Sequence, residues 1–203
     1  MIDPRIYEVF REIGEDLYTA QMISSHGGNL SIRLGDRVVI KRRGTMLGRL
    51  KPNDLIETRL DKNDSGVALA STELLVHRTI YLNTPALAIC HCHPRTAVAF
   101  SLSSDEIVPI DNEASYLLKK VPIVMEEFAS GTPQMANKVT DALKNYKIIM
   151  LRGHGSFATG QTLDEAFFWS STLEEACQIM LFAKQIDEPF IEYRKMSDSY
   201  NKF

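Results

Sequence analysis

Two short apolar runs, each leading into a histidine motif, constrain the fold of this chain most. Leu87–His91 and Lys147–Leu151 are both nearly continuous in hydrophobic residues. Runs of this length without alternation are typical of strands buried on both faces of a sheet. The helical patterns between the expected strands follow no regular order. The chain is therefore predicted to be an α/β domain, with a sheet covered by helices and no strict βαβ repeat.

The remaining elements follow from periodicity and from capping residues. Asp3 suits an N-cap, Pro4 suits the first helical position, and apolar residues recur on one face from Tyr7 to Leu17. Further strands are expected at Asn29–Ile32, Arg37–Ile40, Asp54–Glu57 and Val121–Val124, and a helical turn at Ala114–Leu118. Further helices are expected at Glu73–Leu82, capped by Ser71 and Thr72, at Thr132–Asn145, and at Leu163–Gln185, capped by Thr162.

Length and composition indicate a single domain over residues 1–203. A domain usually takes ~100–200 residues, and this chain is 44% hydrophobic and 24% charged. The net charge of -3 and the short basic cluster Lys41–Arg43 argue against a nucleic-acid partner. No apolar run approaches the ~20 residues of a membrane span, and the N-terminus lacks an apolar signal segment. A cytoplasmic protein is expected, with Cys90, Cys92 and Cys177 as buried free thiols.

The motif His91-Cys92-His93 ends the first apolar run. Side chains alternate across a strand, so the two histidines project to one face while Cys90 and Cys92 face the other. This arrangement suits two imidazoles on one metal ion and excludes the thiol of Cys92 from the same set of ligands. A His-x-His pair by itself is weak support for a metal site.

His154 strengthens this interpretation, because it follows the second apolar run between Gly153 and Gly155. Glycines there allow close approach of the backbone and leave the imidazole projecting into a cleft. The alternative is a simple histidine in a turn. Three histidines with an open position are typical of a catalytic zinc, whereas a structural zinc is closed by four ligands.

Glu73 is the natural carboxylate for such a site. It lies in the first turn expected for its helix, where the helix dipole favours a negative charge. His77 lies four residues further along the same helical face, so a Glu–His ligand pair is an alternative. A structural role is the more typical interpretation for His77.

Three segments upstream carry groups that hold phosphate. Gly27, Gly28 and Asn29 offer backbone N–H groups and an amide, and Gly44 begins a second flexible loop with Thr45. Ser71 and Thr72 combine hydroxyl groups with a helix N-terminus. Backbone N–H groups, hydroxyls and helix dipoles are common partners of phosphate. Each segment alone is an ordinary turn or cap.

Together, these motifs resemble those of the class II aldolase/adducin family. Their order and approximate spacing match, and the resemblance extends over essentially the whole chain. The matching segments are Gly27-Gly28-Asn29-Leu30-Ser31, Gly44-Thr45, Ser71-Thr72-Glu73, His91-Cys92-His93 and Arg152-Gly153-His154-Gly155. The resemblance implies a single three-layer domain with a central, mainly antiparallel sheet flanked by helices. It also implies homotetramers with active sites at subunit interfaces.

The resemblance further implies one zinc, or another divalent metal, per subunit, held by His91, His93 and His154. Glu73 would bind the resting metal or act as the acid/base. The phosphate of the sugar would be held by Gly28, Asn29, Gly44, Ser71 and Thr72, with Arg43 as an added contact.

The implied activity is that of a lyase of carbohydrate metabolism. It would cleave a ketose 1-phosphate, such as L-fuculose 1-phosphate, reversibly to dihydroxyacetone phosphate and a small aldehyde. A sugar-phosphate epimerase and a methylthioribulose-phosphate dehydratase are alternatives on the same scaffold. A non-catalytic, adducin-like assembly module is a third, although it has no need of an intact histidine triad.

The chain departs from the pattern of this family at several positions. The family places a tyrosine, which protonates the aldehyde oxygen, where Ile110–Ala114 stands here. Tyr116, one turn further on, is the expected replacement, with Asp111 or Glu113 as alternatives. His26 and Arg43 stand where small or hydroxylated residues are usual. The tail tyrosines Tyr193 and Tyr200 are candidates to reach a neighbour's site.

Overall fold

The computed structural model describes residues 2–127 and 131–196. Its described strands form one sheet in the order β3-β2-β1-β4-β8-β7-β6-β5. The strands are β1 (Asn29–Leu34), β2 (Arg37–Lys41), β3 (Leu55–Arg59), β4 (Ala88–Cys92), β5 (Glu106–Ile107), β6 (Val121–Val124), β7 (Ile148–Leu151) and β8 (Gly155–Gly160). The helices are α1 (Pro4–Thr19), α2 (Leu74–Asn83), α3 (Arg95–Ser101), α4 (Asn112–Leu117), α5 (Pro133–Leu143) and α6 (Leu163–Ile186). Short 3-10 turns lie at Leu47–Arg49, Pro52–Asp54, Ser65–Ala68 and Tyr193–Met196.

The sheet is mainly antiparallel. Every neighbouring pair in the described chain is antiparallel except β6 and β7, which run parallel. A parallel pair requires a crossover connection, and here the connection from β6 to β7 contains helix α5. The predicted α/β class with a mainly antiparallel sheet flanked by helices is confirmed.

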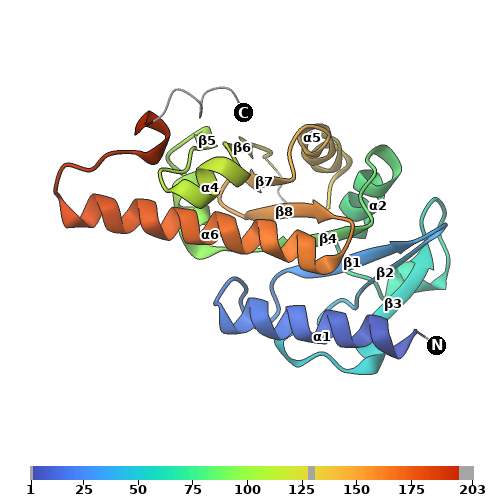
Figure 1. The fold of residues 1–203 in the computed structure, drawn as a ribbon. Coiled ribbons are helices and arrows are strands. Elements are labelled where there is room, and N and C mark those ends of the chain that lie inside the picture. The colour runs from blue at the N-terminus through green and yellow to red at the C-terminus, as the bar shows by residue number, and fades with distance from the viewer. Residues whose placement is uncertain (1, 128–130, 197–203) are drawn as a thin grey trace.

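Helices cover both faces of this sheet (Figure 1). On one face α2 and α5 pack onto the sheet through a cluster that includes Leu74, Ile80, Met135 and Phe157. On the other face α1 packs over β1, β2 and β4, and α6 packs beside it with α3. Cys90 and Cys92 belong to the α1 side and are buried free thiols, as predicted. The central strand β4 is therefore buried on both faces along its whole length.

Most predicted elements exist within a few residues of their expected bounds, but one cap is wrong. Ser71 and Thr72 do not cap α2; the N-cap is Glu73, whose side chain makes no capping hydrogen bond. The hydroxyl of Ser71 instead accepts the N–H of Glu73 at 3.3 Å, in a turn that precedes the helix. The carboxylate of Glu73 accepts a hydrogen bond from the amide of Asn29 in β1 instead of capping its own helix. Thr162 caps α6 as predicted, by accepting the N–H of Glu165.

The sequence interpretation missed α3, β5 and β8. Helix α3 is too short to show periodicity, and β5 has only two residues. Strand β8 begins and ends with glycine and contains Ser156 and Thr159, so it lacks an apolar run although all six of its residues are buried. None of the helices that the structure describes is long and apolar enough to cross a membrane.

Candidate active site

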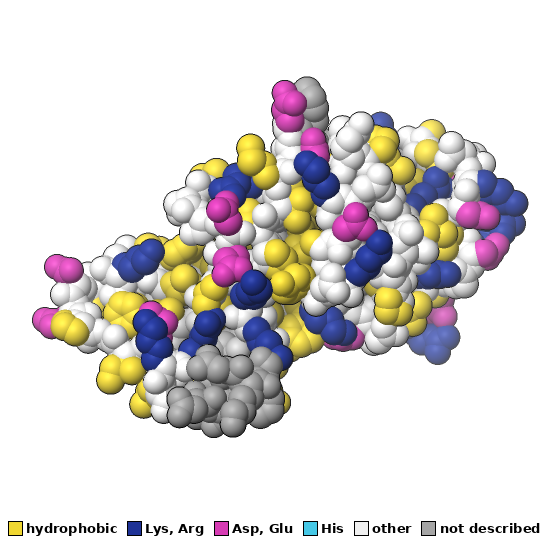
Figure 2. All heavy atoms as spheres, turned by 90° about the horizontal axis from the view of Figure 1, so that it is seen from above, with side chains coloured by type: hydrophobic (Ala, Val, Ile, Leu, Met, Phe, Trp, Pro, Cys, Tyr) yellow, Lys and Arg dark blue, Asp and Glu magenta, His cyan; other side chains and the backbone are white. Residues whose placement is uncertain are grey.

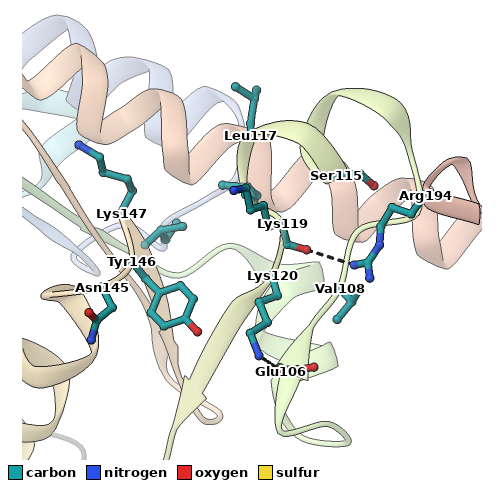
Figure 3. A pocket seen from close by; sticks show the side chains of 12 residues that line it. Glu106, Val108, Ser115, Leu117, Lys119, Lys120, Asn145, Tyr146, Lys147 and Arg194 are labelled. Atoms are coloured by element: carbon teal, nitrogen blue, oxygen red, sulfur yellow. Dashed lines mark hydrogen bonds and ion pairs between the residues drawn. The ribbon is translucent and has the colours of Figure 1, made fainter. Parts of the chain in front are cut away.

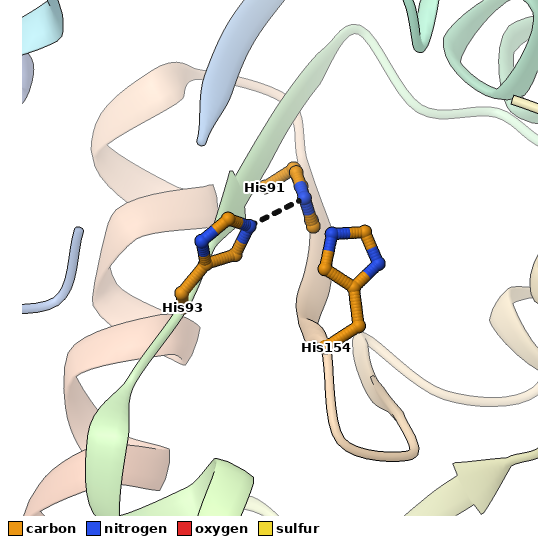
Figure 4. Close-up of side chains that lie close together, drawn as sticks. All are labelled: His91, His93 and His154. Carbon is orange, nitrogen blue, oxygen red and sulfur yellow. Dashed lines mark hydrogen bonds between the residues drawn. The ribbon is translucent and has the colours of Figure 1, made fainter. Parts of the chain in front are cut away.

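Three histidine side chains point toward one another at the end of β4 and in the turn between β7 and β8 (Figure 4). His91 is in β4, His93 follows it, and His154 lies in the turn. The Nε2 atoms of His91 and His93 are 3.1 Å apart, and each pair of rings has centroids 4.9 or 5.0 Å apart. One nitrogen from each of the three imidazoles lies within 4.8 Å of the other two. The structure thus brings the predicted triad together.

Sheet register and a glycine explain this convergence. In the register, His91 is opposite Asn29 of β1 and Phe157 of β8, and its ring stacks on the ring of Phe157. A Cβ atom at Gly155 would clash with the carbonyl oxygen of Cys92 and would lie 2.6 Å from Cδ2 of His93. Only glycine lets the β7–β8 turn approach β4 this closely.

The protonation of His91 follows from its partners. Its Nδ1 lies 2.8 Å from the carbonyl oxygen of Ser156, which only accepts, so Nδ1 carries a hydrogen. Burial, followed by the neighbouring imidazoles, lowers the pKa of His91 well below its ordinary value, and burial lowers that of His93 to about 4. Neutral His91 therefore presents the lone pair of Nε2 to the cluster, as a metal ligand does.

Glu73 faces this cluster from the start of α2. Its Oε2 lies 3.1 Å from Nε2 of His91, and its Oε1 lies 3.9 Å from Nε2 of His154. The side-chain amide of Asn29 donates to Oε2 at 2.6 Å, while the buried Oε1 has no hydrogen-bond partner in the described part of the chain. Burial raises the pKa of Glu73 to about 7, against the opposing effects of Asn29 and the charge of Lys41.

This donor set fits a divalent cation. Three imidazole nitrogens lie within 4.8 Å of one another, and the carboxylate of Glu73 lies beside two of the three rings. One buried oxygen of this carboxylate is left without a proton donor among the described residues. Buried polar atoms in native proteins normally have a partner, which for such a set is a metal ion.

The cluster forms the floor of a cavity of about 200 Å³. All six residues predicted to bind phosphate line it, together with the triad and Glu73. The lining consists of His26, Gly27, Gly28, Asn29, Lys41, Arg42, Arg43, Gly44, Ser71, Thr72, Glu73, His91, His93 and His154. Three cationic side chains, those of Lys41, Arg42 and Arg43, line the cavity together with one carboxylate, that of Glu73. This excess of positive charge favours an anionic ligand.

Lys41 and Arg42 line the cavity although the sequence interpretation did not place them in the site, and Lys41 is the buried one of the two. It ends β2, is only 4% exposed, and its Nζ donates to the carbonyl oxygens of His26 and Gly28, each at 3.1 Å. Burial lowers its pKa to about 8, although the charge of Glu73 opposes this. Its place at the end of a buried strand is the sequence feature that could have indicated a buried lysine. Its two arginine neighbours made the cluster resemble ordinary surface charge.

Comparison with known proteins identifies the family of the chain that carries this site. The sequence description of the Class II Aldolase and Adducin N-terminal domain matches residues 8–181. The chain belongs to the class II aldolase/adducin family. An L-fuculose phosphate aldolase of Methanococcus maripaludis is 30% identical over 171 residues, which cover 84% of this chain and 93% of that protein.

Two further relatives show the range of this family. The crystal structure of L-fuculose-1-phosphate aldolase from Thermus thermophilus is 38% identical with a TM-score of 0.86, and covers 93% of this chain and 100% of that one. A 3-oxo-tetronate 4-phosphate decarboxylase of Haemophilus influenzae is 28% identical over 186 residues, covering 88% of each chain. These likenesses indicate an enzyme of the aldolase, or lyase, type.

Two further residues that the sequence offered as site residues, His77 and Tyr116, do not line the cavity. His77 is buried in α2, where its Nδ1 hydrogen-bonds to Oγ of Ser31 at 2.6 Å, and Ser31 also bonds to the hydroxyl of Tyr81. Burial lowers the pKa of His77 to about 3, so it is a neutral structural histidine. Tyr116 lies on α4, is 59% exposed, and is not among the described residues that line the cavity.

The alternatives to Tyr116 have other roles in the described chain. Asp111 caps α4 by accepting the N–H of Ala114 at 2.9 Å, and Glu113 is exposed. The N–H of Tyr193 donates to the carbonyl oxygen of Ile110, while Tyr200 lies outside the described residues. None of the described residues predicted as the general acid lines the histidine cavity within one chain, and the role of Tyr116 stays a prediction.

A larger hollow, of about 690 Å³, lies beside α4, β5 and the connection from α5 to β7 (Figure 3). It is lined by the cations Lys119, Lys120, Lys147 and Arg194, and Lys120 pairs with Glu106 at 2.9 Å. Seen from above, the molecule carries lysine and arginine side chains beside strips of hydrophobic ones, with no histidine visible (Figure 2). Four buried groups whose pKa values are strongly shifted by burial line the smaller cavity, namely Lys41, Glu73, His91 and His93. That cavity is therefore the candidate active site.

Proposed function

We propose that this protein is a zinc-dependent aldolase that cleaves a ketose 1-phosphate, such as L-fuculose 1-phosphate, reversibly to dihydroxyacetone phosphate and a small aldehyde. One observation carries the proposal. The carboxylate of Glu73 faces the three-imidazole cluster inside a cavity whose rim is lined with cations and with the loops predicted to bind phosphate. The named activities of the relatives support the same substrate class.

His91, His93 and His154 would hold the zinc, with Glu73 beside it. When bound, zinc supplies a Lewis acid that stabilises negative charge developing on substrate oxygens. Zinc is proposed in place of another divalent ion because three imidazoles and an open position are its common set of ligands in catalytic sites.

Glu73 is proposed to move the proton at the carbon next to the carbonyl. A group transfers protons best when its pKa is near the working pH, and burial raises the pKa of Glu73 to about 7. The amide of Asn29 fixes the orientation of this carboxylate through its 2.6 Å hydrogen bond.

The phosphate is proposed to lie at the rim, away from the histidines. Gly28, Gly44, Ser71 and Thr72 offer N–H and hydroxyl groups there, and Arg43 adds an exposed guanidinium. Lys41 supplies the buried charge. Fixing the phosphate orients the carbonyl end of the substrate at the histidine cluster, which lowers the entropic cost of reaction.

Decarboxylation of a phosphorylated 3-oxo acid is a second candidate, favoured by a specific observation. Aldol cleavage needs a group that exchanges a proton with the aldehyde oxygen, and no tyrosine is among the described residues that line the cavity. Loss of carbon dioxide needs no such group, since the carboxylate leaves without a proton and only the remaining carbon is protonated. The cations of the rim also suit a substrate with two anionic groups, and one relative is named as such a decarboxylase. Epimerisation and dehydration remain alternatives that the same assay separates.

The deciding experiment supplies the zinc-loaded protein with a panel of ketose 1-phosphates and phosphorylated 3-oxo acids. An enzyme-coupled assay measures dihydroxyacetone phosphate, and a second one measures carbon dioxide. Triose together with an aldehyde supports the aldolase, and triose with carbon dioxide supports the decarboxylase. Epimerised or dehydrated sugar without triose rejects both. Protein that binds no metal and turns over none of these substrates would support the non-catalytic, adducin-like alternative.

Assembly as a homotetramer in the cytoplasm, with active sites at subunit interfaces, is part of the proposal. Large hydrophobic side chains are exposed at the end of α6 and after it, including Phe182, Ile186, Phe190 and Ile191. Exposed apolar groups in such numbers are typical of subunit contacts. Light scattering should give four times the mass of one chain; a monomer with full activity would reject interface active sites.

A further inference from the structure

Helix α3 begins without a cap of its own. Its N-cap position is Pro94, which has no side-chain acceptor, and the N-cap residue makes no side-chain hydrogen bond. The first N–H groups of a helix need partners from outside the helix. Proline is useful at this place for another reason, because it restricts the preceding residue, His93, to extended backbone conformations.

Glu174 of α6 supplies the missing cap. Its two carboxylate oxygens each accept the N–H of Thr96 at 3.1 Å, and Oε2 also accepts the N–H of Ala97 at 3.1 Å. These are the two N–H groups that an N-cap side chain ordinarily satisfies. The side-chain amide of Gln178 donates to Oε1 at 3.1 Å and holds the carboxylate in place. Glu174 is only 7% exposed, so these hydrogen bonds replace the contacts with water that its buried carboxylate lacks.

The capped helix connects the two segments that carry histidines. At its start, only His93 and Pro94 separate α3 from the end of β4. At its end, the hydroxyl of Ser101 accepts the N–H of Gly153 at 2.9 Å, and the carbonyl oxygen of Ser101 accepts Nη1 of Arg152 at 2.9 Å. Gly153 and Arg152 precede His154 in the β7–β8 turn. A shift of α3 therefore moves both His93 and His154.

We propose that Glu174, acting from α6 as the cap of α3, is a positioning residue for the metal-binding histidine cluster. It does not touch the cluster; it fixes the helix that spaces His93 from the turn of His154. The inference rests on the proposed metal site. Its consequence is that removal of the carboxylate weakens metal binding even though all four proposed metal-binding side chains are intact.

The experiment titrates metal-free protein with Co²⁺ and follows the visible absorption, whose intensity reports the geometry around the ion. Glu174→Gln keeps the size of the side chain but replaces one acceptor oxygen by an amide that cannot accept. Its dissociation constant for Co²⁺ should rise about tenfold, the effect of a lost helix cap, and its absorption band should change in intensity. The matched control is Glu175→Gln, at the exposed neighbouring position on α6, which should leave both unchanged.

A rescue variant separates positioning from general destabilisation. Pro94→Asn adds a neutral cap side chain to α3 itself, so in the Glu174→Gln background it should restore the Co²⁺ affinity to that of Pro94→Asn alone. If Glu174→Gln does not fold, the comparison is made in this double variant. Affinity equal to that of Pro94→Asn alone then supports the inference, and affinity weaker than that of Pro94→Asn alone in a folded double variant overturns it.

Two failures are distinguishable. Wild-type protein that binds neither Co²⁺ nor Zn²⁺ would reject the proposed metal-dependent function. Wild-type protein that binds Co²⁺, with Glu174→Gln matching it in affinity and absorption, would reject only the role of Glu174.

Discussion

Replacing Glu73 by glutamine should make the metal-free protein more stable and the enzyme nearly inactive. The carboxylate is buried, and its pKa is raised from 4.5 to about 7 chiefly by that burial. A folded-state pKa above the unfolded value means that ionisation opposes folding. The penalty is absent below about pH 4.5, grows as the pH rises to 7, and is then constant at about 3 kcal/mol. Glutamine keeps the shape and can still accept from Asn29, but it never ionises.

The assay has two parts. Urea unfolding of metal-free protein should show Glu73→Gln more stable than wild type at pH 8, by up to about 3 kcal/mol, and equal to it at pH 4.5. On the zinc-loaded protein, kcat should fall by ~10²–10⁴, or about 3–5 kcal/mol of transition-state stabilisation, while substrate binding persists. Glu175→Gln, which changes an exposed glutamate, is the control for both. A variant with unchanged kcat, or one with no stability gain at pH 8, would refute the reasoning.

Three other perturbations test the remaining parts of the site. His93→Ala should fold but lose the bound zinc, which elemental analysis measures; retained stoichiometric zinc would contradict its role. Lys41→Met should raise KM for the sugar phosphate about tenfold or more. The KM of the wild type should itself rise above about pH 8, as Lys41 loses its proton. A KM that changes neither with this substitution nor with pH would exclude Lys41 from phosphate binding. Gly155→Ala should cost at least about 2 kcal/mol in urea unfolding and lower zinc content, because its Cβ would overlap the carbonyl oxygen of Cys92; wild-type stability would show that the turn can move.

The sequence reveals those parts of the molecule in which the local pattern and the tertiary role agree. The run into His91 predicts both a buried strand and the direction of its two histidines, because alternation along a strand is a local property. Thr162 predicts the start of α6 for the same reason. The loops with Gly28, Gly44 and Ser71 carry groups from which the sequence predicts anion binding, and all three line the cavity.

Other features depend on partners far along the chain. Strand β8 has no pattern of its own and is a strand because β4 and β7 bond to both its edges. Lys41 resembles a surface charge until two carbonyl groups from the segment before β1 surround it. Glu174 resembles its neighbour as one of two adjacent helix acids, and only the packing of α3 on α6 distinguishes it from Glu175. In the proposed tetramer, the position of Tyr116 relative to a cavity would depend on a neighbouring subunit.

The histidine cluster also bears on how the chain folds. Its members come from β4, from the β7–β8 turn and, with Glu73, from the start of α2, so no short stretch of sequence can form it alone. An unfolded chain therefore holds a divalent ion far more weakly than the native one, and the ion favours the native state by mass action. Because contacts between distant segments form late and slowly, the ion should act mainly on the unfolding rate. A chelator would then shorten the lifetime of the folded protein in addition to stopping its chemistry.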